Sequence, residues 1–125
     1  MTARSLLSLG ALFAIMSTAG CVRAPTPPKQ SVAGRWTGTI AGVGTMDLTL
    51  TQSRGSVNGN GVLTGGDSSL HVAVLGRFYD PGFTLTLVAP GYAPTHFMGD
   101  LQGQVLVGQI FGSDFAGESV SLAKR

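Results

Sequence analysis

Residues 46–51 read MDLTLT, and in this stretch apolar and polar side chains alternate one by one. Met46, Leu48 and Leu50 occupy one set of positions, while an aspartate and two threonines occupy the other. Successive side chains of a β-strand point to opposite faces of a sheet, so this alternation is typical of a strand with one buried and one wet face. The segment therefore predicts a half-buried β-strand.

The same period of two recurs further along the chain, for example at LHVAV (residues 70–74) and FTLTL (residues 83–87). Turn-forming stretches such as Gly65-Gly66-Asp67 and Asp80-Pro81-Gly82 separate these runs, because Gly and Pro favour chain reversals. After Ser31 no run repeats convincingly at the helical spacing. The pattern predicts eight strands, over residues 33–40, 43–52, 56–64, 69–79, 83–89, 95–102, 104–111 and 118–123.

Short connections between successive strands predict an all-β fold built as an antiparallel up-and-down meander. We expect a meander of this length to close into a small barrel, because open edge strands invite aggregation. A two-sheet β-sandwich is the alternative. The 19 glycines favour strands and turns over helices, since each glycine inside a helix costs about 1 kcal/mol relative to alanine.

Charge is sparse, at 11% of the chain, and it is nearly balanced in the folded part. From Ser31 onward there are five basic and six acidic side chains, and no run of Lys or Arg. Proteins that bind nucleic acids need clustered basic side chains to displace counterions from phosphates. Nucleic acid is therefore not an expected partner.

The first 21 residues, MTARSLLSLGALFAIMSTAGC, combine one basic residue, an apolar stretch and small residues before the only cysteine. The apolar stretch, Leu6 to Met16, has the length of a signal-peptide core and is too short to span a bilayer. The segment Thr18-Ala19-Gly20-Cys21 resembles the bacterial lipobox, with Thr18 at the position where that family most often has Leu.

The lipobox resemblance implies that a lipoprotein signal peptidase recognises residues 18–20 and cleaves after Gly20. It also implies that Cys21 carries a diacylglyceryl group on its sulfur, and often an acyl group such as palmitate on its amino group. Two or more acyl chains anchor a protein firmly to a membrane, whereas one gives marginal binding. An ordinary secretory signal with an incidental cysteine, or a first helix that is never removed, are the alternatives.

This interpretation divides the chain into a signal peptide (1–20), a lipidated cysteine with a proline-rich tether (21–30), and a β-barrel domain (31–125). Residues 22–30, VRAPTPPKQ, hold three of the six prolines, which favour an extended chain. Arg23 and Lys29 lie where they could touch anionic head groups. Val22, rather than Asp, follows the cysteine, which favours the outer membrane, facing the periplasm, in an organism that has one.

Gly34-Arg35-Trp36 resembles the G-x-W opening of the calycins, the up-and-down barrels that include lipocalins and avidins. The resemblance implies that Trp36 closes one end of the barrel. Avidin-type biotin sites use several tryptophans and this chain has one, so biotin is not an expected ligand. Avidin-like barrels also include periplasmic inhibitors of metalloproteases, which act through a free N-terminal segment.

Candidate functional residues are few. His71 and His96 are the only histidines, and neither stands in a ligand cluster that would hold a metal, so we expect no metal and no cofactor. Aromatic residues beside turns could form a ligand or partner rim at a barrel mouth, although the phenylalanines among them could instead be core. This rim is predicted to comprise Tyr79, Phe78, Tyr92 and His96.

The sequence thus favours a non-enzymatic envelope lipoprotein whose barrel binds a small apolar ligand or an envelope protein. An avidin-like periplasmic protease inhibitor is the second hypothesis. A weak hydrolase is the third, because Ser, His and Asp all occur, but no G-x-S-x-G turn is present to set a nucleophile on a strained corner. An open cavity, a protruding rim loop or converging polar groups would distinguish the three.

Overall fold

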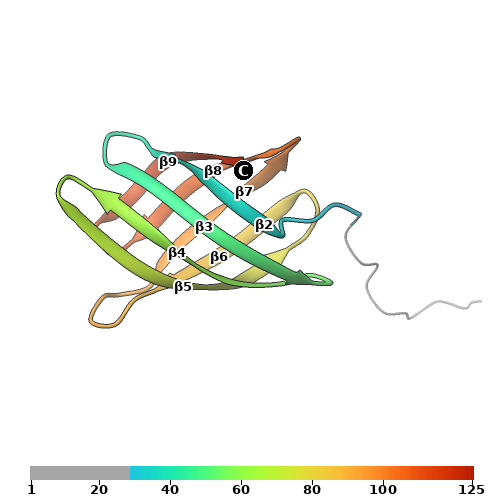
Figure 1. Cartoon of the computed structure of the whole chain (residues 1–125), viewed down its shortest axis with the longest axis horizontal. Coiled ribbons are helices and arrows are strands. Elements are labelled where there is room, and N and C mark those ends of the chain that lie inside the picture. Colours follow the sequence, from blue (N-terminus) through green and yellow to red (C-terminus); the bar gives the residue numbers. More distant parts are fainter. Residues whose placement is uncertain (1–28) are drawn as a thin grey trace, which may run out of the picture.

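A computed structural model describes residues 29–125 of the chain as a closed barrel without helices (Figure 1). Each strand pairs antiparallel with the next along the sequence, and the last strand pairs with the first. The predicted eight-stranded up-and-down barrel is confirmed, and the sandwich alternative is not adopted. The strands are β2 (Gly34–Ile40), β3 (Gly44–Ser53), β4 (Ser56–Gly65), β5 (Ser68–Phe78), β6 (Gly82–Val88), β7 (Thr95–Gln102), β8 (Val105–Gly112) and β9 (Phe115–Lys124).

Seven of the eight strands begin and end within one residue of the ranges predicted from the sequence, and β9 begins three residues earlier. The difference has a local cause in a β-bulge between β8 and β9. Ile110 pairs with Glu118 and Phe111 with Ala116, so Gly117 has no opposing residue. A bulge shifts the alternation of side chains by one position, and this hides the start of the strand in the sequence.

The barrel interior is filled by apolar side chains rather than hollow. Residues at alternate positions of every strand point inward, and the large fully buried ones include Trp36, Phe78, Phe97, Met46 and Leu106. Phe83 and Phe97 pack edge to face, with ring centroids 4.8 Å apart. An eight-stranded barrel is just wide enough for side chains to fill it, so a site for another molecule must lie at an end or on the outer surface.

Glycines on the inward-facing side allow the strands to curve tightly around this core. At seven of them, an added Cβ would overlap a backbone carbonyl of the neighbouring strand. Glycine in a strand commonly marks such a close backbone approach or bend. The seven are Gly38, Gly44, Gly59, Gly61, Gly76, Gly99 and Gly108.

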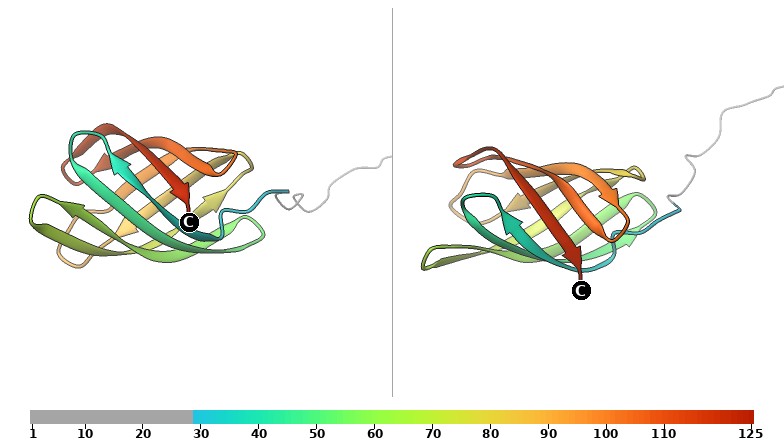
Figure 2. Two further views of the ribbon diagram at one scale, coloured as in Figure 1. Left: turned by 45° about the horizontal axis from the view of Figure 1, so that its top comes forward. Right: turned by 90° about the horizontal axis from the view of Figure 1, so that it is seen from above.

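The meander gives the barrel two distinct ends, visible in the views of Figure 2. Consecutive turns of a meander lie at opposite ends, so the β3–β4, β5–β6 and β7–β8 turns share one end with the start of β2. We call this the closed end, and residues 29–33 enter the barrel there (Figure 1). The β2–β3, β4–β5, β6–β7 and β8–β9 turns form the other end, which we call the mouth.

Candidate functional site

Trp36 and the residues just before β2 seal the closed end. The Trp36 side chain is 1% exposed, and its indole N–H donates to the carbonyl of Val32 over 2.8 Å. The Val32 side chain is itself buried, and its backbone N–H donates to Oε1 of Gln52. These contacts join Trp36, Val32 and Gln52 at the start of β2.

Asp80, in the β5–β6 turn, fixes the chain at the point where it reaches the closed end. Its carboxylate accepts the backbone N–H groups of Lys29 and Gln30, at 2.8 and 3.0 Å, and the side-chain amide of Gln30 at 2.8 Å. The Gln30 backbone N–H is the main cause of a pKa of Asp80 below its ordinary value, with the Gln30 side chain and Lys29 acting in the same direction. Hydrogen bonds to the ionised form favour it over the protonated one.

The mouth carries a pocket of about 390 Å³. Its floor comes from four apolar residues near the strand ends, Ile40, Leu63, Leu70 and Phe115. Ile40 and Leu63 belong to the buried core, and Leu70 and Phe115 pack partly buried against it. The pocket thus lies over the top of the filled interior and does not reach into the barrel axis.

The rim of the mouth pocket is more polar and more exposed than its floor. Tyr92, from the β6–β7 loop, and Val43, from the β2–β3 turn, are 58% and 43% exposed. Hydroxyl groups and one carboxylate complete the rim, from Thr64, Ser68, Ser69, Ser113 and Asp114. An apolar floor with a few polar groups around it is the usual composition of a site for a small organic ligand, and pockets of about 300–1,000 Å³ are typical.

The four residues predicted to form one rim are not brought together. Phe78 is buried in the core and is not a rim residue. Tyr79 lies at the closed end, beside Asp80, whereas Tyr92 lines the mouth pocket. The β5–β6 and β6–β7 turns are consecutive in the meander, and consecutive turns lie at opposite ends, so one rim could not hold both tyrosines.

Both histidines lie on the outer face of the barrel. His71 is exposed on β5, as the alternation predicted. His96 is exposed on β7, where its Nδ1 lies 3.3 Å from the hydroxyl of Thr86 on β6. Neither histidine is among the residues that line the mouth pocket. Within residues 29–125 no three His, Cys, Asp or Glu side chains converge as a metal site would need.

Sequence reasoning missed most of the pocket's lining, namely Val43, Leu63, Leu70, Phe115 and the hydroxyl residues. Each of these lies in or beside the first, third or seventh turn of the predicted meander. Grouping alternate turns of the predicted meander would have placed them at one end. The predicted lipidation site, Cys21, and the residues 18–20 before it lie outside the described part of the chain.

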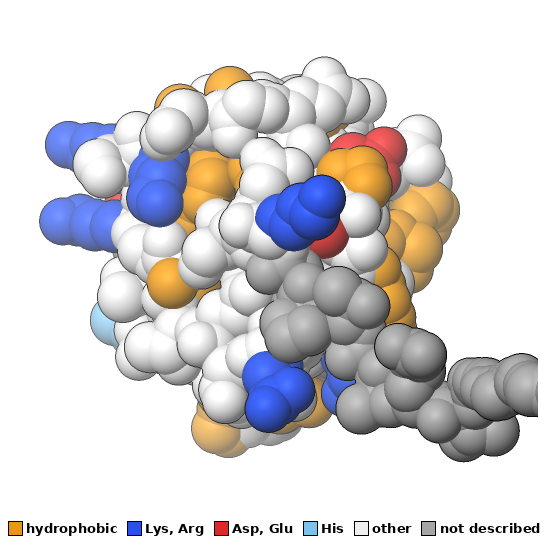
Figure 3. Space-filling model, turned by 90° about the vertical axis from the view of Figure 1, so that its right-hand side faces the viewer, with side chains coloured by type: hydrophobic (Ala, Val, Ile, Leu, Met, Phe, Trp, Pro, Cys, Tyr) orange, Lys and Arg blue, Asp and Glu red, His pale blue; other side chains and the backbone are white. Residues whose placement is uncertain are grey.

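The fold also gathers charge that is scattered along the sequence. Figure 3 faces the closed end and shows several basic side chains around the point where the chain enters. The sequence has no run of Lys or Arg, yet every basic side chain from Lys29 onward lies at or next to this end. They are Lys29, Arg35, Arg54, Arg77, Lys124 and Arg125.

In the described residues no helix is long and apolar enough to cross a membrane. Comparison of the chain with protein-family models gives no match, and comparison with curated proteins gives none either. The fold and its two ends therefore define the class: a small, filled up-and-down barrel, consistent with the calycin resemblance, with one end sealed by a tryptophan and a pocket at the other.

Proposed function

We propose that this protein is a non-enzymatic binding lipoprotein of the cell envelope, which holds a small apolar ligand in the mouth pocket. The observation that carries the binding role is the apolar floor of that pocket, formed by Ile40, Leu63, Leu70 and Phe115 above a filled core. Rim hydroxyls such as those of Ser68 and Ser69 would orient a polar group of the ligand.

An envelope-protein partner is the second candidate for the same site, and the exposed Tyr92 favours it. Tyrosine is enriched at protein–protein contacts because it offers a large apolar area with a polar tip. The β6–β7 loop that carries Tyr92 extends beyond the strand ends at the mouth (Figure 1). The same pocket and loop would then receive a side chain of the partner.

The anchoring part of the proposal rests on the lipobox resemblance of Thr18-Ala19-Gly20-Cys21. In this proposal Cys21 carries the lipid, and the barrel stands in the periplasm on the outer membrane. Replacing Cys21→Ala should block lipidation and leave a precursor that keeps residues 1–20 or is cleaved elsewhere. Intact mass spectrometry of the wild-type protein should show acyl groups on Cys21, and a free thiol there would refute the lipid anchor.

Ligand binding is tested with the uncharged fluorescent probe N-phenyl-1-naphthylamine and protein beginning at Lys29. Tyr92→Ala should weaken probe binding by about tenfold, which corresponds to ~1.4 kcal/mol. Tyr79→Ala is the matched control, because Tyr79 is 62% exposed at the opposite end of the barrel and Tyr92 is 58% exposed at the mouth. Equal effects of the two substitutions, or no probe binding by the wild type, would refute a ligand site at the mouth.

A further inference from the structure

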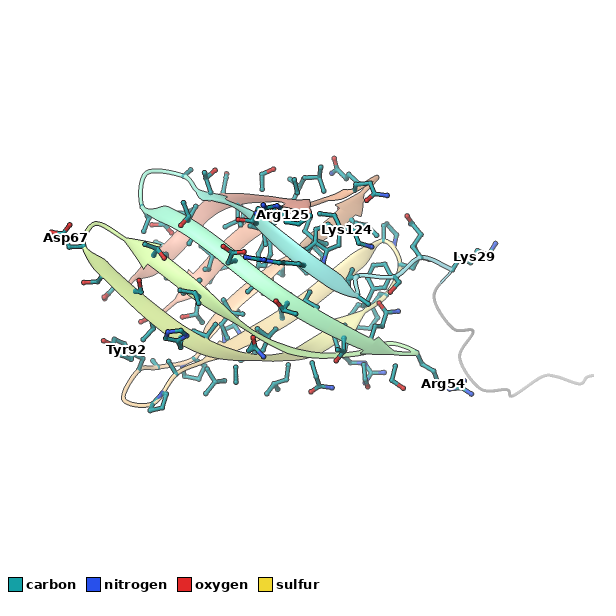
Figure 4. The ribbon with its side chains drawn as sticks, viewed as in Figure 1. Lys29, Arg54, Asp67, Tyr92, Lys124 and Arg125 are labelled. Carbon is teal, nitrogen blue, oxygen red and sulfur yellow. The ribbon has the colours of Figure 1, made fainter. Side chains whose placement is uncertain are left out.

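The described side chains are separated by charge along the barrel axis. All six basic side chains lie at or beside the closed end, whereas three acidic ones lie at or beside the mouth. Figure 4 shows Lys29 and Arg54 at the closed end and Asp67 and Tyr92 at the mouth. The acidic side chains near the mouth are Asp67, Asp114 and Glu118.

The acidic groups nearer the closed end offset only part of its positive charge. Asp80, in the β5–β6 turn, accepts three N–H groups from Lys29 and Gln30 and keeps its negative charge. Asp100 lies near the same end of β7. Asp47, in the mouth half of β3, lies beside Arg35, with 3.5 Å between Oδ1 and Nε. Even when all three carboxylates are counted against the six basic side chains, an excess of three positive charges remains.

A polar cleft of about 220 Å³ lies within the closed end. Lys124 is one of its lining residues, with its ammonium 5.7 Å from the centre of the Trp36 ring. Gln30, Ser31 and Gln104 supply further hydrogen-bonding groups around it. An ammonium with amide and hydroxyl donors beside it is a suitable surface for the phosphate of a lipid head group.

The closed end is also the end to which the N-terminal part of the chain is connected. Only seven residues lie between Cys21 and Lys29, and the eight residue-to-residue steps of a fully extended chain span at most about 28 Å. An anchor at Cys21 would hold the closed end within this distance of the bilayer. The anchor alone would not fix the orientation of the barrel relative to the bilayer. The charge separation then determines that orientation.

We propose that the closed end is a docking surface for an anionic lipid bilayer, on which the barrel stands with its mouth facing away from the membrane. Anionic membrane surfaces attract clustered basic side chains and repel acidic ones, so the charge separation favours this orientation over the reverse. The proposal goes beyond a lipid anchor, because it assigns an orientation and a contact surface. It depends on neither lipidation of Cys21 nor ligand binding at the mouth.

The chain contains a matched pair of reporters for this orientation, its two tyrosines. Tyr79 lies at the closed end and Tyr92 at the mouth, and their exposed fractions are 62% and 58%. The full chain is added to vesicles of phosphatidylglycerol and phosphatidylcholine, and hydroxyl-radical oxidation of each tyrosine is followed by mass spectrometry. Oxidation of Tyr79 should slow several-fold while that of Tyr92 stays unchanged. On pure phosphatidylcholine vesicles neither rate should change.

The double substitution Arg54→Asn/Arg77→Gln removes two charges from the closed end, and Asn suits the positive φ of Arg54. Each basic residue near an anionic surface strengthens binding by about fivefold. The variant should therefore need about 25-fold more lipid for half-maximal protection of Tyr79. If the chain is anchored, its ratio of docked to undocked protein should fall by the same factor.

Thr39→Glu/Ala93→Glu is the control, because it lowers the net charge equally at exposed positions near the mouth. This control should protect Tyr79 as the wild type does. Three results would overturn the proposal. Tyr79 could be oxidised at the same rate on anionic and neutral vesicles, or anionic vesicles could protect Tyr92 from oxidation instead of Tyr79. Duplex DNA could also protect Tyr79 from oxidation where anionic vesicles do not. Intact mass of the same sample reports lipidation of Cys21 separately.

Discussion

Trp36 shows how much one side chain contributes at the closed end. It is buried, and its N–H is bonded to Val32. Truncating a buried Trp costs about 3–5 kcal/mol, a large part of the roughly 5–15 kcal/mol that stabilises a domain. Trp36→Ala should therefore be strongly destabilising in urea denaturation. His71→Ala, at an exposed position of β5, should change stability by only about 0.5 kcal/mol. Similar small effects of both would show that Trp36 does not seal the barrel.

Asp80 makes part of the stability depend on pH. Hydrogen bonds from Gln30 and Lys29 hold the folded-state pKa of Asp80 below its ordinary value of 3.8. A carboxylate with a lowered pKa contributes stability above its unfolded pKa and loses that contribution as the pH falls through the folded value. The contribution of Asp80 should thus be complete at pH 6 and decline below about pH 4.

The Asp80→Asn variant isolates this effect, and asparagine suits the positive φ at position 80. Its melting temperature should be below that of the wild type at pH 6, and the difference should shrink at pH 3. Asp67→Asn, at the mouth, is the charge-matched control for other acid effects. A difference between wild type and Asp80→Asn that stays constant from pH 6 to pH 3 would contradict the role of the ionised carboxylate.

At the scale of strands, the inward glycines decide how closely neighbours approach. Gly99 on β7 pairs with Gly108 on β8. A Cβ at Gly99 would overlap the Val107 carbonyl and lie 2.6 Å from the Gly108 Cα. Because backbone atoms cannot move aside cheaply, Gly99→Ala should destabilise the barrel by about 1–3 kcal/mol or more.

Gly82→Ala is the control for the Gly99 substitution. A Cβ at Gly82 would meet its nearest atom, Oδ1 of Asp100, at 3.6 Å, which is ordinary contact. This variant should be neutral, or more stable by up to about 1 kcal/mol, since alanine restricts the unfolded chain. Chemical denaturation of both variants measures the contrast. Equal stability of the two would mean that the strands separate easily at Gly99.

The strands themselves could be predicted from the sequence because each half-buried strand leaves its own period of two, as at residues 46–51. The bulge at Gly117 could not, because one unpaired residue breaks that period at the start of β9. The candidate site could be predicted only in part. Tyr92 was identified. Leu63 and Leu70 look like ordinary strand residues in the sequence, because nothing local marks which end of a strand lies at the mouth, and Phe115 falls between two predicted strands.

The whole molecule has two ends with different chemistry, and this property is not visible in the overall composition. Basic and acidic side chains alternate irregularly along the sequence, but the meander returns every second turn to the same end. The basic residues therefore meet at the closed end and the apolar pocket forms at the mouth. If the closed end contacts a membrane, the membrane would not cover the binding site at the mouth.

The folded unit begins before the first strand. Val32 lies before β2, yet its side chain is 1% exposed, it accepts the Trp36 N–H, and its own N–H is bonded to Gln52. The buried core from Val32 to Leu122 lies within the described residues. A chain that begins at Lys29 should therefore fold alone, and its far-UV circular dichroism should show strand with little helix. A helical spectrum, or no fold without residues 1–28, would refute this boundary.

A chain that begins at Gly34 tests the same boundary from the other side. It lacks the buried Val32 side chain and leaves the Trp36 indole N–H without its partner carbonyl. Burial of a valine contributes about 1.5–3 kcal/mol, and an unsatisfied buried donor costs a further 1–3 kcal/mol or so. The Gly34 chain should thus be less stable than the Lys29 chain by about 2–5 kcal/mol in urea denaturation. Equal stability would place Val32 in the linker and the true start of the barrel at β2.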